Sequence, residues 1–422
     1  MTNDPSDHLF RHEAGRMVAV LTRLFGLHNL ALAEDVVQDA FCRALEVWKL
    51  RGVPDNPSAW LMKTAKNRAL DVLRRERTAR TFAPDLGRLL HTEWTVANAV
   101  EEVFDATGIP DDRLRMMFSC CHPRLAEAAQ TMLVLQLVAG FGAREIAQAF
   151  VSTHAAVEKR LTRAKRTLAD SSALFDIADA ADFAQRLPAV QRALYLIFSE
   201  GYHGASAEAV VRSDLCREAI RLARLLAEHP LGDTPSTRAL CASMYLNGAR
   251  LAARLDASGA LSPLYEQDRS QWNRAMIAAG REWLERSATG TAVSRYHVEA
   301  AIASEHASAL SFEATDWRQI VSLYDTLMRI APSPIVALNR AIAVAQLEGP
   351  QRGLEAVAAI GDRERLERYP FYHAALGELE HRRGRSDVAR EHFTQAGALA
   401  RNHAERHFFE GRVAACAGLS AS

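Results

Sequence analysis

Apolar residues recur every three or four positions along most of the chain, which is the period of an amphipathic α-helix. Runs of this kind fill residues 8–50, 58–80, 109–170 and most of 171–422, and glycines and prolines interrupt them. Alternating runs rich in Val, Ile and Thr, which are typical of strands, are scarce. The pattern therefore predicts an all-α fold.

The interruptions divide the chain into predicted domains. Residues 81–108 carry a weak pattern punctuated by Pro84, Gly87 and Gly108, and this stretch is interpreted as a linker. On either side we predict two small helical domains, at 1–80 and 109–172. A helical extension at 173–300 and a repeat region at 301–422 follow.

The predicted helix at 58–80 has two different faces. Ser58 follows a loop with two prolines and is expected to cap a helix that runs to about Arg80. One face is apolar and the other carries Lys63, Asn67 and Arg74. An amide beside cations can read a base edge while the cations hold phosphates. Taken alone, the face is more typical of an ordinary solvated helix.

Residues 143–169 fit a helix-turn-helix. A short helix is predicted at 143–150, a turn near Ser152 and a basic helix from His154 to about Ala169. The buried stripe of the second helix is expected to be Val157, Leu161, Ala164 and Leu168. The opposite face carries Lys159, Thr162, Arg163 and Arg166. This division suits DNA binding better than a plain helical hairpin.

The last 120 residues contain a degenerate repeat. Ser308, Ala341 and Gly377 are small residues spaced 33 and 36 positions apart. Twelve positions after Ala341 and Gly377 stand two more small residues, Gly353 and Ala389, and sixteen positions after them stand two large residues, Val357 and Phe393. Small residues let paired helices approach, and the large residue fills the gap between them. A period near 34 is typical of tetratricopeptide repeats. The concave face of such repeats is a candidate surface for a peptide, protein or small ligand.

Net charge is zero, with 51 basic and 51 acidic side chains, but the charges are unevenly placed. Residues 58–80 hold seven basic and two acidic side chains, and residues 153–168 hold five and one. Two basic stripes predict two separate contacts with a polyanion.

No catalytic residue, metal site or cofactor is predicted. The chain has no HExxH, GxSxG or P-loop string, and none of its six cysteines has CxxC spacing. Cys120-Cys121-His122 lacks a second ligand pair, so buried cysteines are expected rather than zinc. Asp111-Asp112 is interpreted as a helix start, and Trp272, Trp283 and Trp317 as core residues. No run of about 18 apolar residues and no signal peptide is seen, which predicts a cytoplasmic protein without a membrane segment.

Several strings resemble the extracytoplasmic-function (ECF) sigma factors. Residues 33–41 (AEDVVQDAF), 57–61 (PSAWL) and 66–75 (KNRALDVLRR) resemble their domain 2, and 156–165 (AVEKRLTRAK) resembles their domain 4. Further strings resemble a subgroup with a C-terminal tetratricopeptide-like extension. They are IPDDRL (109–114), CCHP (120–123), LYLIFSEGY (194–202), QDRSQW (267–272), Asp316-Trp317 and SPIVALNRA (333–341).

The resemblance implies partners and site residues. Core RNA polymerase would be bound through its β′ coiled coil, and also its β flap, with Glu34, Asp35, Gln38 and Asp39 contacting the coiled coil. The −10 promoter element would be held by Lys63, Asn67, Arg68, Arg74 and Arg75, with a flipped-out base at Asn67. The −35 element would be contacted as duplex by Lys159, Thr162, Arg163 and Arg166. Glu158 stands where many members have an arginine, which leaves the −35 sequence open.

The sequence supports three hypotheses of different kinds. The first is a sigma factor whose C-terminal helical domain modulates its activity. The second is a conventional helix-turn-helix regulator that binds duplex operator DNA and senses a ligand or partner. The third is a scaffold built on the repeats. The second leaves the acidic helix at 34–41 and the Asn67 helix unexplained, and the third leaves both basic faces unexplained.

Overall fold

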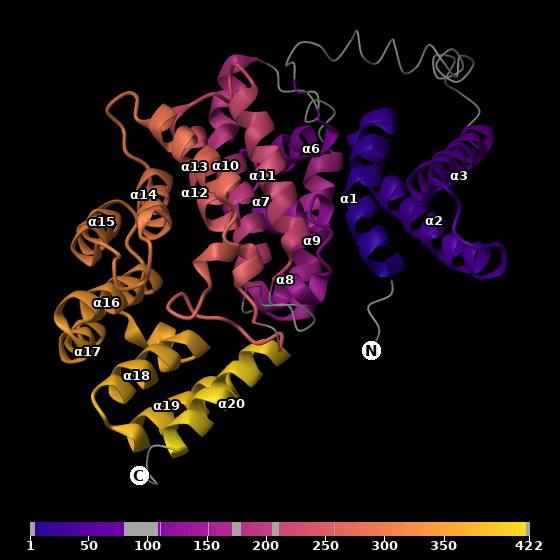
Figure 1. Ribbon diagram of the computed structural model, residues 1–422. Coiled ribbons are helices and arrows are strands. Elements are labelled where there is room, and N and C mark those ends of the chain that lie inside the picture. The colour runs from indigo at the N-terminus through magenta and orange to yellow at the C-terminus, as the bar shows by residue number, and fades with distance from the viewer. Residues whose placement is uncertain are drawn as a thin grey trace. The chain divides into compact units, whose positions relative to one another are not determined.

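The computed structural model describes residues 5–79, 109, 111–150, 152–170, 179–204, 211–256 and 258–418. Within these ranges the secondary structure is helical apart from one isolated bridge between Leu255 and Leu261 (Figure 1). The predicted all-α fold is confirmed. The chain forms two compact units. Unit 1 comprises Met1–Leu194 with His229–Gly232, and unit 2 comprises Tyr195–Glu228 with Asp233–Ser422. The predicted linker at 81–108 lies outside the described residues.

Unit 1 contains the helices predicted for both small domains. In chain order they are α1 (Pro5–Phe25), α2 (Leu30–Arg51), α3 (Pro57–Ala79), α6 (Asp112–Cys120), α7 (Glu127–Leu137), α8 (Ala143–Ala149), α9 (His154–Ala169) and the first part of α10 (Ala180–His203). A stack of aromatic rings joins α1, α2 and α3. The ring centroids of Phe10 (α1) and Phe41 (α2) are 4.7 Å apart, and those of Trp48 (α2) and Trp60 (α3) are 5.5 Å apart. Such contacts bury large apolar areas and fix how α1, α2 and α3 pack.

Helix α1 also packs against the second set of helices. A Cβ on Gly15 would lie 2.6 Å from the carbonyl oxygen of Val138, so only glycine permits this approach of α1 to the end of α7. Arg23 of α1 forms an ion pair with Asp112 of α6 at 3.1 Å. The two predicted domains, at 1–80 and 109–172, therefore contact each other directly within unit 1.

Helix starts follow local capping chemistry. Helix α3 begins at Pro57 rather than after Ser58, because the Asn56 side chain accepts a hydrogen bond from Ala59 N at 3.0 Å. Proline suits the first helical position, where its missing N–H has no partner to lose. Asp111 caps α6 by accepting from Leu114 N at 3.0 Å, as expected for a helix start. Thr153 caps α9 in the same way.

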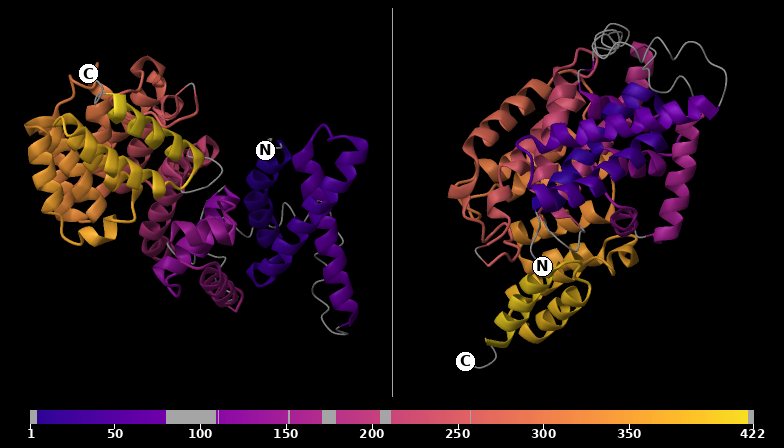
Figure 2. Two further views of the ribbon diagram at one scale, coloured as in Figure 1. Left: turned by 90° about the horizontal axis from the view of Figure 1, so that it is seen from below. Right: turned by 90° about the vertical axis from the view of Figure 1, so that its right-hand side faces the viewer.

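Unit 2 is an array of helices that pack on their successors (Figures 1 and 2). After the end of α10 come α11 (Ser213–Glu228), α12 (Pro235–Gly248) and α13 (Arg274–Ser287), with short turns at Leu251–Ala253 and Arg269–Gln271. The later helices are α14 (Arg295–Ser308), α15 (Trp317–Ile330), α16 (Pro334–Glu348), α17 (Pro350–Ala358), α18 (Pro370–Arg382), α19 (Ser386–Ala398) and α20 (His403–Gly418).

Glycine and aromatic residues set the spacing of the last helix pairs. A Cβ on Gly377 of α18 would lie 2.9 Å from the ring of Phe393, which is buried on α19. Gly353 of α17 likewise faces Ala345 of α16, where an added Cβ would overlap the alanine methyl group. The predicted role of small residues holds at these two positions. It was wrong at Ser308, which is exposed at the end of α14 because the buried residues of that helix precede it.

Candidate polymerase and nucleic-acid interface

The acidic residues of α2 share one outward face. Ala33, Val36, Val37, Ala40 and Ala44 form the buried stripe of this helix. Asp35, Gln38 and Asp39 lie between these positions and are exposed. Carboxylates and an amide on consecutive turns suit a basic partner surface.

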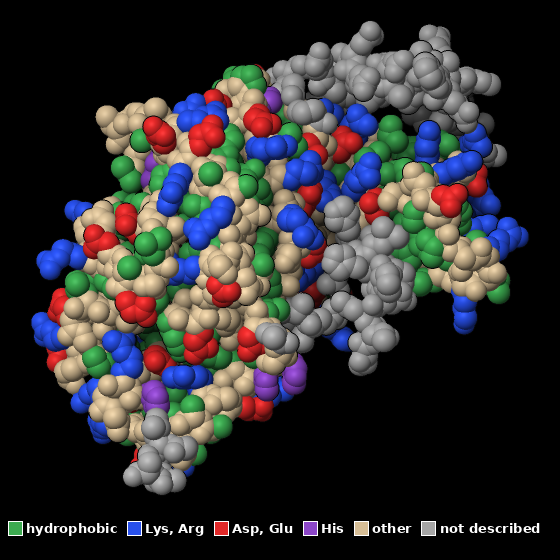
Figure 3. Space-filling model, in the orientation of Figure 1, with side chains coloured by type: hydrophobic (Ala, Val, Ile, Leu, Met, Phe, Trp, Pro, Cys, Tyr) green, Lys and Arg blue, Asp and Glu red, His purple; other side chains and the backbone are tan. Residues whose placement is uncertain are grey.

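Helix α3 presents most of its predicted nucleic-acid residues to solvent. Leu61, Ala65 and Ala69 are buried, whereas Val72 and Leu73 are only half-buried. The exposed side chains include every predicted contact on this helix: Lys63, Asn67, Arg68, Arg74 and Arg75. Lys and Arg side chains gather over this part of unit 1 in Figure 3, whereas basic and acidic groups are interspersed over unit 2.

One ion pair joins the faces of α2 and α3. Arg68 Nε donates to Asp39 Oδ2 at 3.1 Å, and both side chains are about half exposed, at 46% and 57%. An exposed pair of this kind contributes at most about 1 kcal/mol. The residues predicted to bind polymerase and those predicted to bind DNA therefore meet at a shared edge, and the pair between them can exchange partners.

Helix α9 has the division of faces that the sequence predicts. Val157, Leu161, Ala164 and Leu168 are buried. Lys159, Thr162, Arg163 and Arg166 are all exposed on the other side. His154 lies 3.5 Å from Glu158, and Arg166 lies 3.9 Å from Asp170. Within the described residues neither Lys159 nor Arg163 forms an ion pair, so both cations can meet phosphates.

The structure places Glu34 apart from its three neighbours. Its carboxylate accepts a hydrogen bond from Lys165 Nζ of α9 at 2.6 Å, and both side chains are about three-quarters buried. Lys165 is one of the five basic residues counted at 153–168, and no role was predicted for it from the sequence. Its position on the edge between the buried stripe and the basic face was the available signal.

The cysteine string is part of the core of unit 1. Cys120 and Cys121 are free thiols and buried, as expected, and burial raises the pKa of Cys121 to about 12. In the part of the chain that the structure describes, no three His, Cys, Asp or Glu side chains gather as metal ligands would. No helix among those residues is long and apolar enough to span a bilayer.

Comparison with known proteins identifies the N-terminal helices. The family model Sigma-70 region 2 matches residues 9–79, which span α1, α2 and α3. A Sigma-70 region 2 domain at the N-terminus supports a sigma factor. The match supports a role for this sigma factor in transcription initiation by RNA polymerase.

The rest of the sigma factor matches less informative relatives. A family of unknown function, DUF6596, matches residues 186–288. The uncharacterized protein R00370 of Rhizobium meliloti (strain 1021) is 39% identical over 388 residues, which cover 92% of this chain and 90% of that protein. The two chains are therefore similar in sequence over nearly their whole length. No solved structure is significantly similar to it.

Proposed function

We propose that this protein is an ECF-type sigma factor that docks on core RNA polymerase through α2. The supporting observation is the exposed face of Asp35, Gln38 and Asp39, which lies within the region matched by Sigma-70 region 2. The β′ coiled coil is the proposed partner for this face, with Glu34 joining after it leaves Lys165. The β flap is the proposed partner of the helices at 109–172. A protein that works on chromosomal DNA with polymerase is cytoplasmic, which is the proposed location.

Helix α3 is the proposed reader of the −10 element. Its exposed Asn67 lies between Lys63 and Arg74 on one face, with Arg68 and Arg75 beside them. Opening a duplex costs a few kcal/mol, and capture of a base with phosphate contacts offsets that cost. Asn67 takes the flipped-out base, and the cations hold the non-template strand.

Helix α9 is the proposed recognition helix for the −35 element. Lys159, Thr162, Arg163 and Arg166 face outward from a capped helix that follows the short helix α8. Glu158 is exposed on the same helix and only 3.5 Å from His154. A carboxylate in the major groove favours a cytosine amine, so Glu158 biases the −35 sequence toward cytosine.

Binding both elements requires α2 and α9 to separate. The −10 and −35 elements lie about 25 base pairs apart, which corresponds to roughly 85 Å of B-form DNA. In unit 1 the two helices contact each other directly through Glu34 and Lys165. This state of unit 1 is therefore a resting state in our proposal, and polymerase binding opens it.

Unit 2 is the proposed modulator of activity. Its paired helices from α14 to α20 have the glycine and aromatic spacing of tetratricopeptide-like repeats at Gly377 and Phe393. The roughly 220 residues after Leu194 exceed what promoter binding requires. The unit modulates initiation in place of a separate regulatory protein.

Run-off transcription tests the proposal. Purified bacterial core polymerase is assayed on genomic promoter fragments with the wild-type protein, with Asp35→Arg and with Asp387→Arg, a control on exposed α19. We expect specific transcripts that Asp35→Arg abolishes and Asp387→Arg leaves intact. Transcripts that persist with both variants would contradict docking through α2. Footprinting of duplex DNA by the protein alone would instead favour the operator-binding regulator.

Deletion of unit 2 tests the modulation. The shortened chain should end at Leu194, because Phe183 of α10 packs 4.5 Å from Phe118 and Arg186 donates to the Phe118 carbonyl oxygen at 3.4 Å. Ending the chain before α10 would expose that contact. A change of transcription in either direction supports modulation, and unchanged transcription would refute it.

A further inference from the structure

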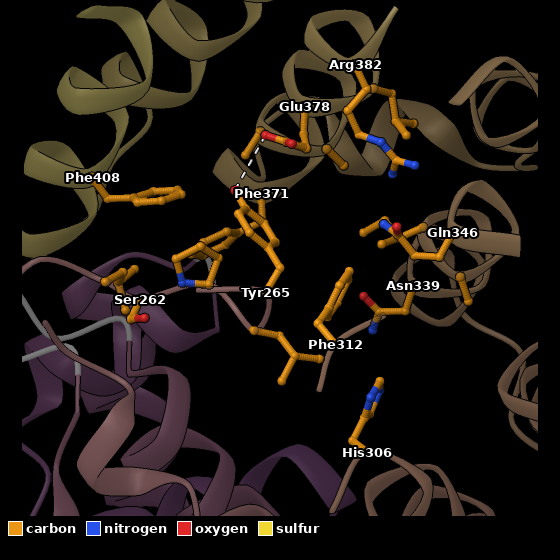
Figure 4. A pocket seen from close by; sticks show the side chains of 18 of the residues that line it. Ser262, Tyr265, His306, Phe312, Asn339, Gln346, Phe371, Glu378, Arg382 and Phe408 are labelled. Atoms are coloured by element: carbon orange, nitrogen blue, oxygen red, sulfur yellow. Dashed lines mark hydrogen bonds between the residues drawn. The ribbon is translucent and has the colours of Figure 1, made fainter. Parts of the chain in front are cut away.

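Unit 2 holds a cavity lined by aromatic side chains. Its volume is about 380 Å³, which is within the range of small-molecule sites. Tyr265, Phe312, Phe371 and Phe408 line it from different helices and loops (Figure 4). Trp317, expected to be a core residue, is only half-buried and lines the same cavity. Aromatic walls on several sides suit a flat apolar group.

A second, more polar cavity of about 350 Å³ adjoins the first. His203, His306, Tyr324 and Asn339 line both, so the two cavities adjoin at these side chains. Strings far apart in the sequence meet here. The string at 194–202, the pair Asp316-Trp317 and the string at 333–341 each contribute lining residues. Apart from Trp317, which was expected in the core, none of these residues was assigned a role from the sequence.

Arg250 and Arg254 each line one of the two cavities, and Arg269 lies beside them, where it donates to the carbonyl oxygen of His306. Arg250 lines the polar cavity, donates from Nε to Gln267 at 3.2 Å and lies over the Trp272 ring at 5.2 Å. Arg269 lies over the same ring at 4.7 Å. Arg254 lines the aromatic cavity and donates to the Tyr202 carbonyl oxygen at 3.1 Å. Within the described residues none of these three guanidinium groups forms an ion pair, and neutral groups accept their hydrogen bonds instead; Glu313 acts on Arg269 only at longer range.

The acids near the site already have cationic partners. Glu299 in the polar cavity pairs with Arg295 at 2.7 Å and also accepts from Tyr195. Glu378 in the aromatic cavity is hydrogen-bonded to Arg412 and to Tyr265. Neither offsets the charge of Arg250. Arg250 is half-buried and its guanidinium stays protonated, so without an ion-pair partner among the described residues it leaves the polar cavity with an excess of positive charge.

Unsatisfied polar groups point to a missing ligand. His306 is 91% buried, faces the cavity in Figure 4, and its Nδ1 has no hydrogen-bond partner. Its ring is neutral, because burial, and then Arg250 and Arg269, lower its pKa to about 3. Asn339 and Gln346 also face the cavity, and neither side chain makes a hydrogen bond within the described residues. These groups can orient the polar part of a ligand.

We propose that unit 2 binds a small amphipathic anion. Its carboxylate or phosphate group pairs with Arg250 in the polar cavity, and its flat apolar body fills the aromatic cavity between Phe312 and Phe371. His306 and Asn339, at the junction, hydrogen-bond the polar group. Arg250, held in place by Gln267 and Trp272, forms the anion-binding part of the site, and the inference stands independently of the sigma factor's action on polymerase.

Calorimetric titration of the full chain tests this site with three probes of one shape. They are 2-naphthoate, 2-naphthyl phosphate and neutral 2-naphthamide. We expect one binding site per chain and at least tenfold tighter binding of an anion than of the amide. The stronger of the two anions identifies the head group. Equal affinity for anion and amide, or no binding by either anion at millimolar concentration, would overturn the proposal.

Arg250→Gln should remove the preference for the anion while leaving the affinity for 2-naphthamide unchanged. The matched control is Arg352→Gln, an exposed arginine of α17 that lies outside both cavities. Should Arg250→Gln unfold, as judged by circular dichroism, Ala374→Trp is the second variant, since Ala374 is a half-buried lining residue of the aromatic cavity. Tryptophan there should abolish binding of all three probes. A folded Arg250→Gln variant that still prefers the anion over the amide, or a folded Ala374→Trp variant that still binds the probes, would refute the site.

Discussion

Lys165 Nζ donates a hydrogen bond to Glu34 Oε1 at 2.6 Å and thereby joins α9 to α2 within unit 1. One residue belongs to the proposed DNA-recognition helix and the other to the proposed polymerase-binding helix. The same interaction therefore occupies parts of both surfaces. Gly15 against Val138 and Arg23 with Asp112 hold α1 to the same second set of helices. Partner binding must compete with this packed state.

Removing Lys165 should strengthen polymerase binding. Lys165→Ala frees the Glu34 carboxylate and removes an ion pair worth up to about 1 kcal/mol, so affinity for core polymerase should rise by up to roughly fivefold. Fluorescence titration of labelled protein with core polymerase measures this. Lys159→Ala, an exposed cation on the same helix, is the control and should leave polymerase affinity unchanged. An unchanged or weaker affinity of Lys165→Ala would mean that the ion pair does not compete with polymerase.

Asn67 should act in promoter opening rather than in docking. Asn67→Ala removes the exposed amide of α3 while leaving its cations, so open-complex formation should fall at least tenfold at equal polymerase affinity. Permanganate reactivity of unpaired thymines in the −10 element reports the opening. Arg43→Ala, at an exposed position of α2, is the control. Normal opening by Asn67→Ala would refute base capture by this residue.

Two helical glycines of unit 2 should respond oppositely to alanine. A Cβ at Gly377 would lie 2.9 Å from Phe393, so Gly377→Ala should destabilise the unit by about 1–3 kcal/mol. Gly411 of α20 has nothing within 4 Å, so Gly411→Ala should be neutral or stabilise it by up to about 1 kcal/mol. Urea unfolding monitored by circular dichroism measures both. Equal effects of the two substitutions would contradict the close packing of α18 on α19.

His306 should make unit 2 less stable in acid. Its pKa is lowered from 6.5 to about 3 in the folded protein, so the unfolded state binds the proton first as pH falls. Above pH 6.5 the histidine is neutral in both states and does not lower the free energy of unfolding. Between pH 6.5 and 3 that free energy falls progressively, at about 1.4 kcal/mol for each pKa unit.

His306→Gln should therefore flatten the pH dependence of the unfolding free energy in that window. Urea unfolding at several pH values, compared between wild type and variant, isolates this histidine because all other titrating groups remain. His203, whose pKa is also lowered, is one of them. Parallel curves for the two proteins would show that His306 is not buried as a neutral ring.

Local features of the sigma factor followed from local rules. The period of apolar residues predicted the buried stripe of α9 at Val157, Leu161, Ala164 and Leu168, because a helix of known pitch fixes which side chains share a face. The start of α6 after Asp111 followed from capping chemistry. The cap of α3 was missed by two residues, since Asn56 and Ser58 were both competent caps and proline at the first position decided between them.

The sequence by itself determined the helices, their outward-facing charges and the sigma-70 motifs, because each depends on residues within a few turns of one another. Only the tertiary structure decided that Lys165 meets Glu34 across 131 positions, and that Arg250 and His306 adjoin one aromatic cavity. Such pairings depend on how helices pack over long separations, where one glycine such as Gly15 or Gly377 sets the approach. Periodicity identifies a buried face but carries no information on which helix will cover it.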